Sequence, residues 1–295
     1  MVRAKGVLNM LMMNFITMGT VGVLWVLYGY SMAFGNSVGG VVGNPLEFAG
    51  LTSLMSEDAV VGTVPALAFV AFQACFAIIA VALVSGAIAD RATFSGWVVF
   101  TILWATLVYF PAAHWVFAFD GTTAEFGGFI ANSIQAIDFA GGTAIHINAG
   151  AAALALAIVV GKRLEFGVRP MRPHNMTLVM LGAALLWFGW FGFNAGSALG
   201  ATTTAAVAWV NTLAATAAAM LAWLAVEKIR YGHPTSLGAA SGIVAGLVGI
   251  TPAAGSVSPL GALVIGILAG VACAYAIGLK NKLGYDDSLD VVGVH

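Results

Sequence analysis

Long apolar runs alternate with short polar connections along this chain. Each run supplies about 20 residues or more, enough for an α-helix to cross a bilayer core of about 30 Å. The runs are continuous and do not alternate with polar residues, so they predict helices rather than the strands of a β-barrel. We expect eight spans, at 7–34, 64–89, 94–119, 138–161, 174–197, 203–226, 236–255 and 259–279.

Composition supports a membrane protein. The 295 residues are 61% hydrophobic and 8% charged, with a mean hydropathy of +0.98. A soluble domain carries about a quarter charged residues, so this chain cannot cover a water-facing surface. We therefore predict an all-α polytopic membrane protein that forms one transmembrane domain over residues 1–295.

The basic residues predict an orientation. With eight spans, all eleven fall in the N-terminal stub or in even-numbered connections, on one side of the membrane. The opposite connections, near 35–63, 120–137, 198–202 and 256–258, contain none. The positive-inside rule makes the basic side cytoplasmic, so we expect a multi-pass plasma membrane protein. One helix more or fewer would place basic residues on both sides of the membrane, so their one-sided distribution also supports the number of spans.

Three spans carry glycines four residues apart, a spacing that lets helix backbones approach closely. We interpret these pairs as tight packing sites: Gly192/Gly196, Gly242/Gly246 and Gly266/Gly270.

The sequence argues against an enzyme. Cys75 and Cys273 both lie inside predicted spans, which disfavours a disulfide framework or a metal cluster. We find no nucleophile–base pair at useful spacing and no phosphate-binding loop, and we expect no cofactor, no metal and no nucleic-acid partner.

The stretch "DFAGGTAIHINAG", residues 138–150, places an ionisable ring inside a predicted span. Counting from Asp138 puts His146 about 12 Å inward, near the bilayer midplane. A neutral imidazole offers one donor and one acceptor, so it can take a proton on one side and release one on the other. The alternative is a core histidine bonded to a nearby carbonyl. Asp138 reads first as a helix cap, and secondly as a carboxylate that attracts a cation.

A second pattern of aspartate, apolar residues and histidine occurs at "DVVGVH", from Asp290 to His295, on a helix of opposed direction. Two such helix starts indicate an inverted repeat, the arrangement of many transporters with a site at the midplane. Counting places His295 only about 7 Å past Asp290. The two rings meet only if this helix begins below the membrane surface.

Aromatic residues gather toward predicted helix ends. An interfacial belt or simple packing is their ordinary role, and a cation–π cage worth about 0.5–2 kcal/mol per ring is the alternative. The residues concerned are Phe72 and Phe76, Trp115, Phe117 and Phe119, and Trp190 and Phe193 with the nearby Ser197.

Four segments, "DFAGGTAIHINAG", "WFGFNAGSA", "LGAASGIVAGLVGITPAAG" and "DDSLDVVGVH", resemble the ammonium transporter (Amt/Rh) family in order and spacing, most closely its bacterial branch. The resemblance implies eleven helices, built as two inverted five-helix repeats plus one, and a homotrimer with a pore in each subunit. This chain resembles helices two to nine and the opening turns of helix ten, so we expect further sequence beyond both ends.

The resemblance also implies roles for single residues. His146 and His295 resemble the paired pore histidines, and Phe76 and Phe193 resemble the stacked phenylalanine gate. Ammonium recruitment is implied for Phe72, Phe117, Ser197 and Trp115, and supporting roles for Asp138, Trp190 and Asp290. Phe117 departs from the vestibule tryptophan of many members; phenyl is the poorer cation–π partner, and Trp115 could compensate.

The resulting hypothesis is transport of ammonium or methylammonium across the lipid bilayer. Ammonium would be recruited at an outer aromatic vestibule and deprotonated, and ammonia would cross a hydrophobic pore while the histidine pair relays the proton. One alternative is an electroneutral channel for ammonia or another small gas. Another is an ammonium sensor, or a docking platform for a cytoplasmic PII-type nitrogen regulatory protein.

Overall fold

The computed structural model describes residues 1–169 and 171–295. Within these ranges, eight helices are long and apolar enough to span a membrane, which confirms the predicted all-α polytopic fold. The fourth begins at Gly142 rather than 138, and the sixth continues to Tyr231 rather than 226. The spans are Ala4–Phe34, Ala66–Ile88, Phe94–Phe117, Gly142–Val160, Met176–Gly196, Thr203–Tyr231, Ser236–Ala253 and Pro259–Leu283.

The spans combine regular and irregular helical segments. The α-helices are α1 (Val7–Leu24), α2 (Tyr30–Phe34), α3 (Ala66–Val84), α4 (Phe94–Trp104), α5 (Phe110–Phe117), α6 (Asn148–Val160), α7 (Met176–Gly196), α8 (Thr203–Tyr231), α9 (Ser236–Ile250), α10 (Pro259–Ala276), α11 (Leu279–Leu283) and α12 (Val291–Val294). The π-helical turns are Trp25–Gly29, Ala105–Tyr109, Ile130–Ile134 and Gly142–Ile147. The 3₁₀ segments are Ala4–Gly6, Ala49–Leu54, Ser85–Ile88 and Thr251–Ala253. Two short hairpins pair β1 (Ser37–Val38) with β2 (Val42–Gly43) and β3 (Val60–Val61) with β4 (Val64–Pro65).

Polar side chains define where several helices begin. Each of these residues accepts a hydrogen bond from an amide in the first turn, so an otherwise unpaired donor is satisfied at the membrane boundary. The capping residues are Thr93 for α4, Asn175 for α7, Thr202 for α8, Thr235 for α9 and Ser258 for α10.

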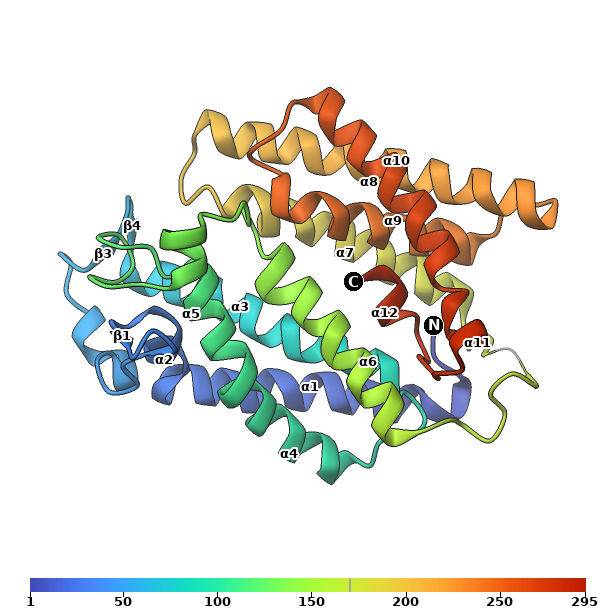
Figure 1. Ribbon diagram of the computed structural model, residues 1–295, viewed down its shortest axis with the longest axis horizontal. Coiled ribbons are helices and arrows are strands. Elements are labelled where there is room, and N and C mark those ends of the chain that lie inside the picture. Colours follow the sequence, from blue (N-terminus) through green and yellow to red (C-terminus); the bar gives the residue numbers. More distant parts are fainter. Residues whose placement is uncertain (170) are drawn as a thin grey trace.

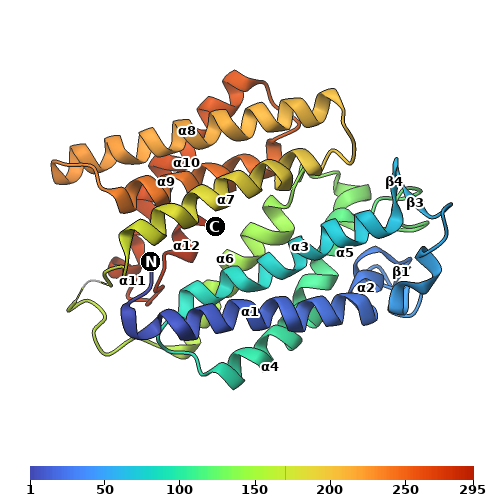
Figure 2. The same ribbon diagram turned by 180° about the vertical axis from the view of Figure 1, so that it is seen from behind.

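The helices form two groups that meet along the middle of the molecule (Figures 1 and 2). One contains α1 to α6 and the other contains α7 to α10. The short helix α12 lies between them and contacts α6 from the first group and α9 and α10 from the second. Residues at this junction therefore come from both halves of the chain.

Glycines bring α8, α9 and α10 close together, as the four-residue spacings predicted. A Cβ atom on Gly266 or Gly270 of α10 would lie 2.2 Å from the carbonyl oxygen of Ala215 or 2.4 Å from that of Ala219, both on α8. Gly242 and Gly246 of α9 meet α8 in the same way. The prediction is wrong for Gly192, where a Cβ atom would meet nothing within 4 Å.

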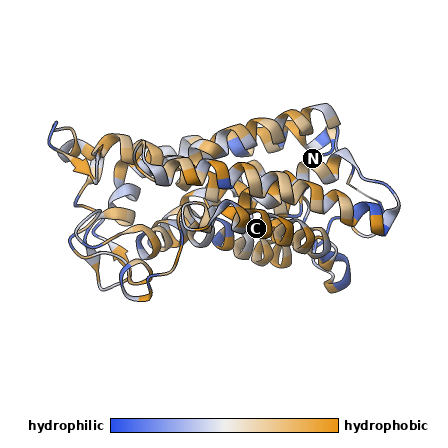
Figure 3. Cartoon of the chain, turned by 90° about the horizontal axis from the view of Figure 1, so that it is seen from above, coloured by the Kyte–Doolittle hydropathy of each residue, from blue (hydrophilic) through white to orange (hydrophobic). Residues whose placement is uncertain are grey.

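Hydrophobic residues predominate in the helices, whereas polar residues gather mainly in the connections at the two ends (Figure 3). Phe188 on α7 and Ile158 on α6, for example, expose 78% and 64% of their surface. Such faces suit a lipid environment. Because this surface needs no polar cover, the buried polar side chains are the informative ones.

Candidate functional site

A cavity of about 230 Å³ lies at the end of the molecule that carries the hairpins. Aromatic rings form most of its wall, together with a few polar side chains from α3, the connection after α5, and the end of α7. Its lining residues are Phe69, Phe72, Gln73, Phe76, Phe117, Phe119, Thr122, Thr123, Asp138, Phe139, Ala140, Ser197 and Leu199. The candidates Phe72, Phe76, Phe117, Ser197 and Asp138 are thus brought together.

Trp115 corrects one expectation. It is not among the described residues that line the cavity, because its side chain turns away from it. The indole Nε1 donates to the carbonyl of Val41 at 2.6 Å, and the ring packs on Phe129 with centroids 5.7 Å apart. Trp115 therefore does not replace the indole that Phe117 lacks.

Aromatic rings lead from the cavity toward the centre of the molecule. Phe72 packs edge-on against Phe76, at 4.7 Å between centroids. Phe76 of α3 then stacks on Phe193 of α7, at 4.3 Å and 25° between the ring planes. Phe193 lies 6.2 Å from the ring of His146. The stacked pair thus stands between the cavity and the histidine.

A π-helical turn presents His146. The amide of His146 donates to the carbonyl of Gly141, five residues earlier, at 3.2 Å. Gly141 has φ +110°, and a Cβ atom there would lie 2.2 Å from the side chain of Ile145, so the turn requires glycine. Such π-helical turns are frequent at functional sites because they re-aim a side chain within a helix.

The two histidines meet. The Nδ1 atoms of His146 and His295 lie 3.0 Å apart, although 149 positions separate the residues. His146 is 1% exposed. The short helix α12 reaches it because Asp286 and Asp287 are themselves buried, so the helix begins inside the molecule. The alternative in which His146 bonds to a nearby carbonyl through Nδ1 does not hold.

The contact determines which nitrogens of the pair carry a hydrogen. One Nδ1 atom must hold a hydrogen and the other must accept it. When both rings are neutral, the donating ring has a bare Nε2 and the accepting ring has a protonated Nε2. The Nε2 atom of His146 is buried without a hydrogen-bond partner among the described residues. The pair can therefore take up a proton at one end and release one at the other.

Trp190 holds the ring of His146 in place. The two rings are nearly parallel, at 11°, with centroids 5.4 Å apart. The indole Nε1 donates to the hydroxyl of Thr251 at 2.9 Å, which fixes the indole in turn. Trp190 was grouped with the residues near an outer end, but it lies beside the histidine pair.

Asp138 caps the turn that carries His146, as its position predicted. Oδ1 accepts from the amides of Gly141 and Gly142 at 2.7 and 2.5 Å, and Oδ2 from those of Thr143 and Ala144 at 2.7 and 3.3 Å. Four amide donors thus stabilise the carboxylate. Because both of its oxygens already accept hydrogen bonds, it has little capacity left to bind a cation directly.

Asp290 is not the counterpart of Asp138. It has φ +63° and its carboxylate pairs with Lys280. Asp287 caps α12 instead, because its two oxygens accept from the amides of Val291 and Val292 at 3.1 and 2.8 Å. Asp287 precedes His295 by eight positions, as Asp138 precedes His146. This equal spacing was the signal that could have identified it.

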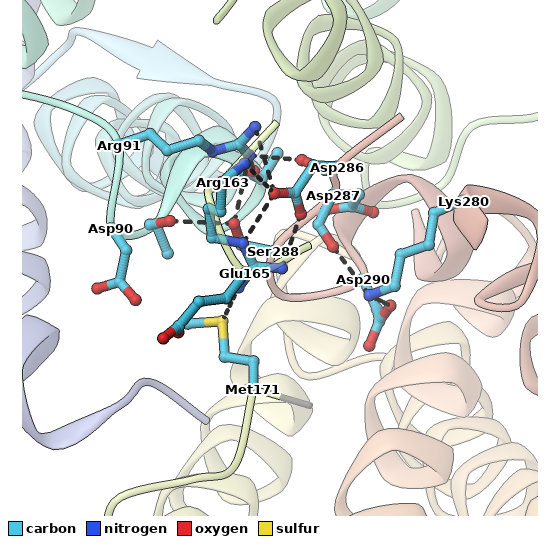
Figure 4. A network of polar contacts seen from close by, with 12 residues as sticks. Asp90, Arg91, Arg163, Glu165, Met171, Lys280, Asp286, Asp287, Ser288 and Asp290 are labelled. Atoms are coloured by element: carbon cyan, nitrogen blue, oxygen red, sulfur yellow. Dashed lines mark hydrogen bonds and ion pairs between the residues drawn. The ribbon is translucent and has the colours of Figure 1, made fainter. Parts of the chain in front are cut away.

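An ion cluster holds the segment before α12 at the basic end of the molecule (Figure 4). Arg163 binds Asp286 through Nε and Nη2 at 2.8 and 2.7 Å, and its backbone amide donates to the same carboxylate. Arg91 donates to the carbonyls of Ala87, Gly161 and Asp286. The segment is thereby tied to the 3₁₀ segment Ser85–Ile88 and to the connection after α6.

The two neighbouring carboxyls of this segment differ in their pKa. Burial alone would raise the pKa of Asp286, but the hydrogen bonds and charge of Arg163 outweigh it, so the pKa lies below its usual value. Burial raises the pKa of Asp287 to about 6, despite the amides of Val292 and Val291. Asp286 therefore stays ionised, whereas Asp287 titrates in a physiological range.

The sequence reasoning missed several residues of the site. Gln73, Phe69, Phe139 and the two threonines Thr122 and Thr123 line the cavity without having been singled out. For Gln73 a signal existed, since an amide between two phenylalanines in an apolar run is uncommon. The threonines lie in a connection whose course the sequence does not specify.

Comparison with known proteins identifies the family and the fold. A sequence model described as the Ammonium Transporter Family matches residues 1–295. An ammonium transporter of Mycobacterium tuberculosis (strain H37Rv) is 62% identical over the whole chain, which spans 65% of that protein. The crystal structure of Candida albicans Mep2 is 35% identical with a TM-score of 0.87, over 95% of this chain and 61% of that one. A structure named "Sensor Amt Protein" is 29% identical with a TM-score of 0.91, over 100% of this chain and 72% of that one.

The match covers every predicted span and every residue of the site, and relatives well above 30% identity share it. The solved structures share the fold over 95–100% of the chain. The chain belongs to the ammonium transporter family.

Proposed function

We propose that the protein transports ammonium, or methylammonium, by separating the proton from the neutral amine. The cation would be held in the outer cavity and lose its proton there. Ammonia would pass the Phe76–Phe193 stack, and the proton would travel along His146 and His295. The observation that supports this most is the 3.0 Å contact between the two imidazoles below the stacked rings.

Desolvation favours this mechanism over passage of an intact ion. Moving a bare monovalent cation into a dry apolar passage costs on the order of tens of kcal/mol, far more than a few rings return. Potassium has no way to avoid that cost. Ammonium does, because it is a weak acid and its conjugate base is a small neutral molecule.

The polar groups of the cavity suit a cation with N–H donors. The hydroxyl of Ser197 donates to the carbonyl of Phe193 at 2.9 Å, so its lone pairs face outward to accept. Phe72, Phe76 and Phe117 supply ring faces for cation–π contact. With phenyl in place of indole at Phe117, we expect weaker recruitment than with tryptophan.

The fate of the proton decides whether transport carries current. If the imidazoles relay the proton inward, each cycle moves one charge, and an inward-negative potential contributes about 2.3 kcal/mol per 100 mV. If the proton returns outward, the protein is an electroneutral ammonia channel. The neutral pair has one Nε2 atom that can accept a proton and another that can donate one, and this arrangement favours the relay.

The similarity to a protein named "Sensor Amt Protein" supports a second candidate, an ammonium sensor or a docking platform. In either role the basic connection 161–175 would meet a cytoplasmic partner such as a PII-type regulator. A pull-down from cytoplasm at high and low nitrogen tests this, and transport that persists without any bound partner argues against it. We further infer a homotrimer in the plasma membrane with the basic connections cytoplasmic.

Replacing His146 tests the main proposal. The full-length protein and its His146→Leu variant are reconstituted into liposomes, and currents after an ammonium jump are recorded on a solid-supported membrane. We expect a current from the parent protein and none from the variant. His174→Gln, at an exposed histidine outside the pore, serves as the control and should keep the current. An unchanged current in His146→Leu refutes the relay, and no current in the parent favours the electroneutral channel.

A further inference from the structure

One amide stands in the aromatic wall of the outer cavity. Gln73 lies on α3, next to Phe72 and one turn before Phe76, and its side chain lines the cavity. The residue is 8% exposed. No described residue forms a hydrogen bond with its carboxamide, which has one acceptor oxygen and two N–H donors.

The carboxamide of Gln73 opens into the cavity, since its atoms are not among the fully buried polar atoms that lack a partner. A group of this kind costs about 1–3 kcal/mol if it is left unpaired, so it needs a partner in the cavity. An apolar residue at this position would avoid the cost and still fill the wall. The contents of the cavity are therefore the available partner for the amide.

The other acceptors of the cavity are partly or wholly used. Asp138 already accepts from four backbone amides. Ser197 retains lone pairs, because its own hydrogen is donated to the carbonyl of Phe193. The phenyl rings offer π faces but no directional acceptor. A cation with four N–H donors thus finds in this wall the amide oxygen of Gln73 and the hydroxyl of Ser197, with the hydroxyls of Thr122 and Thr123 also in the lining.

We propose that Oε1 of Gln73 accepts a hydrogen bond from the cation in the outer cavity, and that Gln73 thereby helps to determine its specificity. This rests on the proposed transport of ammonium. Gln73 and Ser197 orient the cation from two sides, while the rings of Phe72, Phe76 and Phe117 meet its remaining surface. The amide supplies a polar contact where Phe117 offers no N–H.

The mechanism separates binding from conduction. Gln73 touches the cation only before the Phe76–Phe193 stack, so its loss should raise KM and leave Vmax unchanged. Hydrogen bonds to charged groups correspond to about a tenfold change in affinity or more. Methylammonium has three N–H donors rather than four, so it can turn its methyl group toward a vacated acceptor. The ratio of the two KM values should therefore shift in favour of methylammonium.

The experiment measures ammonium and methylammonium transport by full-length protein in proteoliposomes. Gln73→Met keeps the length of the side chain and removes the amide; we expect about a tenfold higher KM for ammonium, a smaller rise for methylammonium, and an unchanged Vmax. Gln73→Glu keeps an acceptor and should hold KM at or below the parent value. Cys75→Met, at an exposed site on the same helix, controls for changes in α3.

Two outcomes overturn the proposal for Gln73. One is a KM in Gln73→Met equal to that of the parent protein. The other is a lower Vmax with an unchanged KM, which a merely structural role would give. If Gln73→Met does not insert, Gln73→Glu decides, because a raised KM there contradicts an acceptor role. A parent protein that transports no ammonium refutes the proposed function itself, which is a different result.

Discussion

The ion pair between Arg163 and Asp286 gives a quantitative test of how the segment before α12 is held. The carboxylate of Asp286 is 0% exposed and the guanidinium side chain of Arg163 is 12% exposed. Asp286→Asn would remove the negative charge and leave Arg163, with Arg91 nearby, as uncompensated buried cations. Breaking a buried pair from one side costs about 3–5 kcal/mol, so we expect a loss of this size in the free energy of unfolding.

The free energy can be measured from unfolding by sodium dodecyl sulfate in mixed micelles at pH 7. The matched control is Arg169→Gln, which breaks the pair between Arg169 and Glu165, where the arginine is 76% exposed. Exposed pairs contribute about 0–1 kcal/mol, so the control should change little. The double variant Arg163→Met/Asp286→Leu removes both charges and should cost less than Asp286→Asn alone.

The pH dependence follows from the lowered pKa of Asp286. A carboxyl with a depressed pKa in the folded state stabilises fully above its unfolded value and loses that contribution as the pH falls through the folded value. The difference between the parent protein and Asp286→Asn should therefore persist at pH 5. The reasoning is refuted if Asp286→Asn costs no more than Arg169→Gln, or if the double variant is less stable than the single one.

Two further predictions concern packing and titration. Gly270→Leu, where even a Cβ atom would lie 2.4 Å from a carbonyl of α8, should lower the unfolding free energy by about 3 kcal/mol in the same assay. Gly192→Ala, with nothing within 4 Å, should gain up to about 1 kcal/mol; equal effects would contradict the packing argument. Because burial raises the pKa of Asp287 from 3.8 to about 6, its neutral form stabilises the fold below pH 4, and this contribution falls away as the pH rises through 6. Asp287→Asn should remove a slope worth about 2 kcal/mol between pH 4.5 and 7.5, and an identical slope in both proteins would exclude the effect.

The spans could be predicted because hydrophobic length is a local property. Each apolar run is long enough by itself, and the basic residues fix the count independently. The fine structure depends on neighbours far along the chain. Asp286 is buried because Arg163, 123 positions away, neutralises it, and no local pattern carries that information.

The errors at the site have similar causes. Trp115 and Phe117 stand two positions apart on α5, so their side chains point about 200° apart, and only one of them can face the cavity. The sequence does not say which. Asp290 was favoured because it directly precedes the apolar turn. The cap instead needs a carboxylate that lies far enough before α12 to accept from the first amides of the helix. Asp287 provides it from three positions earlier.

The contact between His146 and His295 has a consequence for biosynthesis. The two rings are 149 positions apart, so a ribosome working at about 5–20 residues per second needs about 7–30 s to add the second after the first. During that interval the nascent polypeptide holds a solitary imidazole within the lipid or the insertion machinery, at an energetic penalty. The histidine pair thus forms late, when the second group of helices arrives, so an unfinished molecule lacks the contact on which the proposed relay depends.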